Sequence, residues 1–153
     1  MDMKDLAQKT VESACRVFLA DLQAMPDDAF AKKFGDATRT VADIVYEVNL
    51  VNAHVCALLR GEDPGAWPDG GWIKAPSDFQ DKSTVIAAFE KSQKQILETL
   101  EASTAESMAD VMKTESGETT RFGRFQFMAL HMWYHSGQLN YIQTLLGDDQ
   151  WHW

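Results

Sequence analysis

Residues 121–148, RFGRFQFMALHMWYHSGQLNYIQTLLGD, decide the fold predicted for this chain. The stretch contains no proline, and its apolar residues recur at spacings that place them on one side of a helix. These residues are Phe122, Phe125, Met128, Met132, Leu139, Ile142 and Leu146. Gly147 suits a left-handed C-cap, so the pattern predicts one long helix from Phe122 to Gly147.

Two histidines, His131 and His135, lie four residues apart on this predicted helix. The spacing puts both imidazoles on one face, one turn apart, where a single metal ion could bind both. A hydrogen-bonded pair of core histidines is the simpler interpretation of the spacing alone, because short motifs are imprecise. Both interpretations stay open on this observation.

The composition is that of an ordinary globular protein: 153 residues, 45% of them hydrophobic and 24% charged, with a net charge of −9. This length fits one domain, residues 1–153, that buries about two-thirds of its unfolded surface. The acidic balance argues against nucleic acid as a partner, because phosphate binding requires Lys and Arg. The N-terminus does not resemble a signal peptide, and no apolar run approaches the roughly 20 residues of a membrane span. We therefore expect a cytoplasmic protein without a membrane partner, in which Cys15 and Cys56 are small buried thiols.

Apolar periodicity predicts three more helices, at about residues 5–25, from Val41 to the residue before Gly61, and at about residues 83–102. The connection at residues 26–39 is expected to hold one short helical turn. Residues 103–120 are predicted to be irregular, with a Ser-Gly turn and no convincing strand pattern. Thr119 or Thr120 is expected to cap the last helix. Four amphipathic helices without strands predict an all-α four-helix bundle.

The second connection, GEDPGAWPDGGWIKAPSDFQD at residues 61–81, is rich in Gly, Pro and Trp. Loops of this length are uncommon in compact domains unless they bind, cover a site or cross between distant elements. Trp67 and Trp72 could cover a site, or they could anchor the crossover by packing.

The second helix supplies further candidate side chains. Glu47 lies within its apolar stripe, where a half-buried carboxylate needs a cation, a metal or several donors; a solvated boundary position is the alternative. His54 lies about 10.5 Å further along the helix, at about 1.5 Å per residue, so Glu47 and His54 should not bind one ion.

The segment HMWYHSGQLNYIQTLLGD resembles the last helix of the DinB/YfiT-like superfamily, whose pattern is His, three residues, His, one residue, Gly-Gln-Leu, and a close at Leu-Gly. The matching residues are His131, His135, Gly137, Gln138, Leu139, Leu146 and Gly147. The resemblance extends more weakly to the second helix, from Thr40 to Glu62, and to the order and lengths of all four helices. It therefore covers nearly the whole chain.

This resemblance implies an up-down-down-up bundle with a long crossover between the second and third helices. It also implies a homodimer and a divalent metal (Zn, Ni or Fe) held by three side chains. His131 and His135 match two of the three ligands. The third ligand in the family is usually a histidine seven residues after the Ser or Thr that starts the second helix, and this chain has Glu47 there. Two imidazoles and one carboxylate are a known ligand set for zinc and iron.

Other assignments remain open in the sequence. His54 is the alternative metal ligand, and loss of metal would leave Glu47 as a hydrogen-bond acceptor for a histidine. Gln138 could orient the cluster, Asn52 and Tyr134 could flank it, and Gly137 is expected to permit close helix packing.

Three functions follow from these readings. The first is a metal-dependent enzyme that transfers a low-molecular-weight thiol to a small electrophilic substrate, since the superfamily includes bacillithiol S-transferases and mycothiol-dependent isomerases. The second is a non-enzymatic, dimeric bundle of stress-response type that binds a metal or ligand. The third is a purely structural bundle with vestigial histidines.

Overall fold

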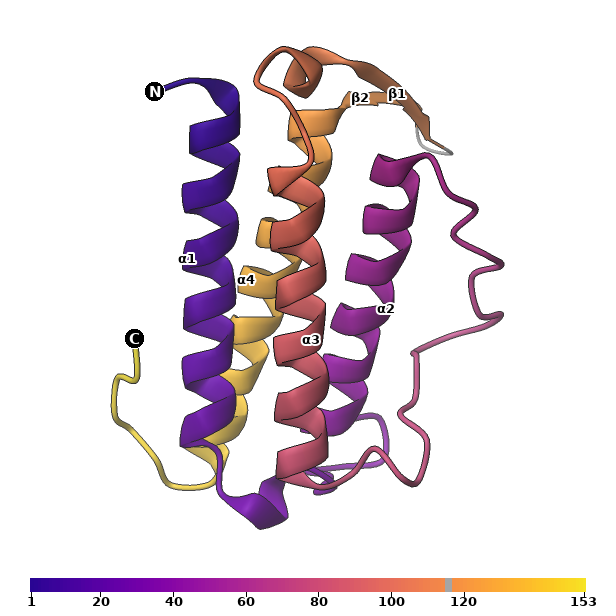
Figure 1. Cartoon of the computed structure of the whole chain (residues 1–153). Helices are drawn as coiled ribbons and strands as arrows, with labels where there is room; N and C mark the ends of the chain where they lie inside the picture. Colours follow the sequence, from indigo (N-terminus) through magenta and orange to yellow (C-terminus); the bar gives the residue numbers. More distant parts are fainter. Residues whose placement is uncertain (115–116) are drawn as a thin grey trace.

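A computed structural model describes residues 1–114 and 117–153 and shows four long helices packed in a bundle (Figure 1). They are α1 (Met3–Ala24), α2 (Val41–Arg60), α3 (Lys82–Glu101) and α4 (Arg121–Leu145). Two short 3-10 helices, η1 (Asp27–Ala29) and η2 (Glu106–Ala109), lie in the connections. The predicted all-α four-helix bundle is confirmed, and η1 is the short turn expected before α2.

Capping residues set the ends of the helices. Thr40 caps α2 in a reciprocal capping box with Asp43, and α2 ends at Gly61 with a positive φ of 73°. Glycine adopts this left-handed conformation without the Cβ clash of other residues. At α4, the Thr120 side chain accepts a hydrogen bond from the Gly123 N–H, so Thr120 is the N-cap.

Hydrogen bonds between the helix ends show in which direction each helix runs. Lys4 at the start of α1 donates to the carbonyl of Glu101 at the end of α3, so α1 and α3 run antiparallel. Arg121 at the start of α4 donates to the carbonyl of Leu59 near the end of α2, so these two helices are also antiparallel. In Figure 1, α1 and α4 run one way and α2 and α3 the other, in up-down-down-up order. Residues 61–81 cross along the outside of α2 (Figure 1).

A small hairpin lies between α3 and α4. Strands β1 (Val111–Thr114) and β2 (Gly117–Thr120) pair antiparallel, with Val111 opposite Thr120. The prediction that residues 103–120 hold no strand was wrong here, because four-residue strands with largely exposed or half-exposed side chains leave no readable alternation. The predicted Ser-Gly turn includes Ser116, which lies outside the described residues.

The core is formed by apolar side chains from all four helices. Cys15 and Cys56 are buried in it and unpaired, as predicted. Burial raises the pKa of the Cys15 thiol to about 12 and also raises the pKa of Cys56, so neither thiol is a ready nucleophile.

Of the described helices, α2 alone is long and apolar enough, by length and composition, to cross a membrane. The sequence was predicted to contain no such run. In the structure α2 is half buried within the bundle, where it contacts α3 and α4, and a core helix of a bundle passes the same test.

Candidate metal site

Three side chains predicted from the sequence lie together between α2 and α4. Glu47 comes from the second turn of α2, and His131 and His135 come from successive turns in the middle of α4. One carboxylate oxygen and one nitrogen from each histidine lie within 4.8 Å of one another. Because α2 and α4 run antiparallel, residues near the start of α2 meet residues well along α4.

The distances within this cluster suit a metal ion. Oε1 of Glu47 lies 3.6 Å from Nε2 of His131 and 3.6 Å from Nε2 of His135, and the two Nε2 atoms are 3.1 Å apart. A tetrahedral ion with bonds of about 2.0–2.2 Å separates its ligand atoms by roughly 3.3–3.6 Å, so the two distances from Glu47 agree with this range and the two nitrogens lie slightly closer together. The donor set of two nitrogens and one oxygen therefore fits a divalent transition metal with a coordination position left open.

Gln138 fixes the orientation of one imidazole. Its Oε1 lies 2.8 Å from Nδ1 of His135, so Nδ1 carries the proton of the neutral ring and Nε2 presents its lone pair to the cluster. A partner on the outer nitrogen of a ligating histidine is typical of metal sites. We expected Gln138 to orient the cluster as a donor, and its amide oxygen instead accepts a hydrogen bond from one histidine of the cluster.

Burial keeps both histidines neutral. It lowers the pKa of His131 to about 4, an effect to which neighbouring His135 adds and which the charge of Glu47 opposes. Burial likewise lowers the pKa of His135, and the hydrogen bond that Nδ1 of His135 donates to Gln138 opposes this shift. Neutral imidazoles have a lone pair available for a metal near pH 7 without first losing a proton.

Arg39, which the sequence analysis did not select, completes the site. Its Nη2 lies 2.5 Å from Oε2 of Glu47, whereas both histidines are paired with Oε1. The two side chains are only 10% and 16% exposed. Nη2 also donates to the carbonyl of Asp43, and the guanidinium lies 5.1 Å from the ring centre of Trp72. Arg39 immediately precedes the N-cap of α2, a position with no recognisable ligand signal.

The other predicted residues are divided between the cluster and the rest of the bundle. The ring of Tyr134 lies 5.0 Å from that of His135, beside the cluster. His54 instead packs edge-on against Trp67 at 5.7 Å. Asn52, expected to flank the site, is buried and donates to Ser92 of α3. Among the described residues, His54 belongs to no group of metal-ligating side chains.

The two loop tryptophans have different places. Trp72 lies over Arg39, next to the cluster, whereas Trp67 contacts His54. Gly137, expected to permit close helix packing, does not do so. A Cβ at this position would meet no atom within 4 Å apart from its own helix backbone and chain neighbours.

The fold and the cluster together define a four-helix bundle that brings two histidines of its last helix to a carboxylate of its second. Residues 10–139 match the sequence pattern of the DinB superfamily, and the chain belongs to this superfamily. No curated protein matches the sequence.

Several solved structures share the fold. A conserved protein from Enterococcus faecalis superposes with a TM-score of 0.73 at 18% identity, covering 97% of this chain and 99% of its own. A DinB-like protein from Bacillus cereus ATCC 10987 gives 0.72 at 11% identity, covering 92% and 91%. A point mutant of the mycothiol-dependent maleylpyruvate isomerase gives 0.71 at 11% identity, covering 89% of this chain and 60% of the isomerase chain.

Proposed function

We propose that this protein holds a divalent metal at Glu47, His131 and His135 and uses it to transfer a low-molecular-weight thiol to an electrophile. The observation that carries the metal is the cluster itself: three neutral or anionic donor atoms 3.1–3.6 Å apart, one on the buried His135 and two on the half-buried His131 and Glu47. The thiol is supported by one structural neighbour, an isomerase that depends on mycothiol.

A bound metal with an open position would lower the pKa of a coordinated thiol and so favour the thiolate at neutral pH. The residues of this chain prepare that chemistry. Arg39 orients Glu47 through one oxygen, and Gln138 holds His135 in the tautomer that points Nε2 inward. The sulfur of the thiol then forms its bond to the electrophilic carbon of a small substrate, which releases its leaving group, while the thiol proton is lost to solvent.

Elemental analysis of protein purified without a metal-affinity tag tests the metal. We expect about one equivalent of Zn, Ni or Fe in the wild type and loss of it in Glu47→Gln and His131→Leu. His54→Ala, a histidine substitution elsewhere on α2, serves as the matched control and should keep the metal. If His54→Ala lost the metal and Glu47→Gln kept it, the proposed site would be refuted. A wild type that takes up no added metal would refute it as well.

Thiol consumption tests the reaction. Metal-loaded protein is incubated with bacillithiol or mycothiol and a panel of electrophiles, and the free thiol is titrated over time. Metal-dependent loss of thiol that disappears in His131→Leu supports the enzyme. A loaded protein that binds metal without consuming any thiol would favour the non-enzymatic binding bundle instead.

We also propose that the protein lies in the cytoplasm, where low-molecular-weight thiols are kept reduced. A second proposal is that it forms a homodimer. Phe127, Leu130 and Trp133 are exposed apolar residues on α4 that a second copy of the chain could bury. Light scattering after size exclusion should give twice the mass of the chain, and Leu130→Glu should shift it towards the monomer.

A further inference from the structure

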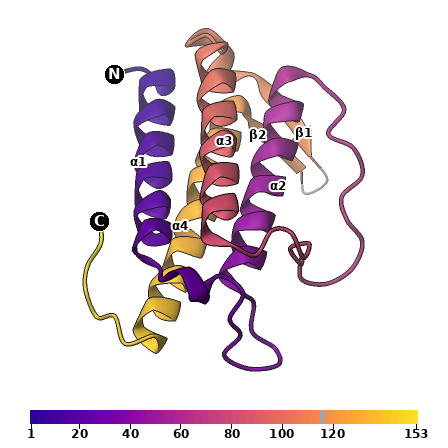
Figure 2. The same ribbon diagram turned by 60° about the horizontal axis from the view of Figure 1, so that its bottom comes forward.

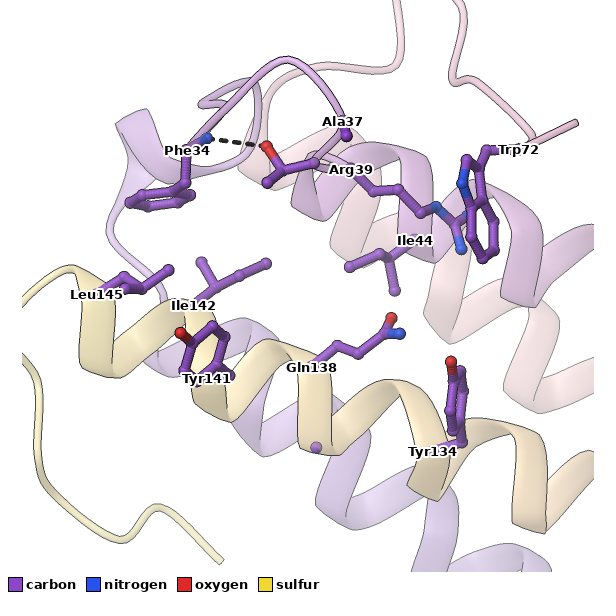
Figure 3. A pocket seen from close by; sticks show the side chains of 12 residues that line it. Phe34, Ala37, Arg39, Ile44, Trp72, Tyr134, Gln138, Tyr141, Ile142 and Leu145 are labelled. Carbon is purple, nitrogen blue, oxygen red and sulfur yellow. Dashed lines mark hydrogen bonds between the residues drawn. The ribbon is translucent and has the colours of Figure 1, made fainter.

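A pocket of about 470 Å³ opens beside the metal cluster, a size that suits a small molecule. Figure 2 brings forward the end of the bundle where residues 30–40 and the last turns of α4 lie together, and the pocket is lined from both and from Trp72. Its walls are largely aromatic and aliphatic. Phe34, Ile142 and Leu145 lie toward one end, and Tyr134, Gln138 and Trp72 lie toward the other (Figure 3).

Arg39 is the one charged side chain among the described residues that line this pocket. Nη2 is occupied by Glu47 and by the carbonyl of Asp43, but Nε and Nη1 are buried without a hydrogen-bond partner. These two atoms carry three N–H groups. Unpaired buried donors on a cation are costly, so a ligand that accepts from them gains the interaction that the protein leaves unfilled.

From this geometry we infer that the pocket binds a small, singly charged carboxylic acid with an aromatic or branched apolar body, whose carboxylate accepts hydrogen bonds from Arg39. The inference rests on the proposed function in taking this pocket as the place where the electrophilic substrate binds. The unpaired N–H groups of one guanidinium suit one carboxylate, and the aromatic walls suit a flat apolar body.

The position of Arg39 links this ligand to the cluster. Arg39 contacts Oε2 of Glu47 and the two histidines face Oε1, so an acid held at Arg39 would be separated from the metal position by the Glu47 carboxylate. Figure 3 shows the Gln138 amide and the Tyr134 hydroxyl pointing across the pocket toward Arg39 and Trp72, where they can contact the same end of the ligand. A bound divalent metal would add positive charge and strengthen binding of the anion.

Calorimetric titration with 2-naphthoate and its neutral analogue 2-naphthamide tests the inference, on metal-free and metal-loaded protein. We expect naphthoate to bind at least about tenfold more tightly than naphthamide, and more tightly still with metal present. Arg39→Gln should remove this preference. Arg60→Gln is the matched control, because Arg60 pairs with Glu62 at the other end of α2 and should leave the preference unchanged.

A second variant keeps the test independent of the Arg39–Glu47 ion pair. Gly137→Leu projects a side chain into the pocket from α4, where a Cβ meets no neighbouring atoms, and should abolish naphthoate binding while leaving the metal content unchanged. Equal binding of acid and amide, no binding of either, or undiminished naphthoate binding in Arg39→Gln would overturn the inference. Selective naphthoate binding by a protein that takes up no metal would sustain the carboxylate site and refute the proposed metal chemistry.

Discussion

Arg39 holds Oε2 of Glu47 at 2.5 Å while Oε1 of the same carboxylate faces the two histidines. One oxygen of the carboxylate thus pairs with a permanent cation, and the other faces the metal position. The arrangement neutralises a largely buried acid in the metal-free protein and orients it for a ligand role. The same ion pair leaves part of the guanidinium unpaired beside the pocket.

The Arg39–Glu47 pair should stabilise the metal-free fold as a unit. Glu47→Gln leaves a largely buried guanidinium without its counter-charge and should lower the free energy of unfolding by roughly 1–3 kcal/mol. Adding Arg39→Gln removes the unpaired charge and should recover part of that loss. Urea denaturation of the two single variants and the double variant measures this coupling, and strictly additive effects would contradict it.

Metal affinity should depend on Gln138 although it is not a ligand. Gln138→Leu removes the acceptor that holds Nδ1 of His135 and should weaken metal binding by roughly 10–100-fold. Gln138→Glu keeps an acceptor at the same place and should restore most of the affinity. Competition with a metal-binding dye gives the constants; equal affinity of the Leu variant and the wild type would show that Gln138 does not orient the ligand.

The sequence predicted those parts of the site that depend on position along a helix. The cap at Thr40 fixes where α2 begins and therefore where Glu47 lies, and the spacing of the two histidines places both on one face of α4. The antiparallel packing of these helices then brings Glu47, His131 and His135 together.

The parts that were not predicted depend on contacts between distant segments. Arg39 acquires its role only when the start of α2 packs near the middle of α4 and when Trp72 folds back over it. Asn52 lies five residues after Glu47, which at about 100° per residue turns its side chain about 140° away from Glu47, and it donates to Ser92 of α3. The β1–β2 hairpin was missed because its strands are too short to show a period.

Gly137→Ala should stabilise the protein. The residue is helical and its added Cβ meets no neighbouring atoms, so the gain is the helix preference of alanine, about 0.5–1 kcal/mol. Gly61→Ala provides the contrast: the space around it is also open, but its φ of 73° should make the same change destabilising. Thermal denaturation of both variants distinguishes the effect of backbone conformation from that of side-chain packing. A loss of stability in Gly137→Ala would imply that the helix packs closely there.

The environment of Asp21, away from the metal site, should make the stability of the protein depend on pH. Its side chain is fully buried and accepts hydrogen bonds from Ser136 of α4 and from the indole N–H of Trp153. Burial raises the pKa of this carboxyl above its ordinary value, although both hydrogen bonds act in the opposite direction. The folded state therefore keeps the proton to a higher pH than the unfolded chain does.

The sign follows from proton linkage. Between the ordinary pKa near 3.8 and the raised value, the native state binds more protons than the unfolded state, so the contribution of Asp21 to stability falls as pH rises through this window. Relative to Asp21→Asn, which cannot ionise, the wild type should lose stability from pH 4 to pH 7. Trp153→Phe removes one hydrogen bond to the carboxylate and should make the loss of stability with pH steeper. Asp28→Asn makes the same change as Asp21→Asn at an exposed position and is the control. Urea denaturation at four pH values supplies the curves. A wild type that gains stability over Asp21→Asn as pH rises would show that the hydrogen bonds from Ser136 and Trp153 outweigh the cost of burying the charge.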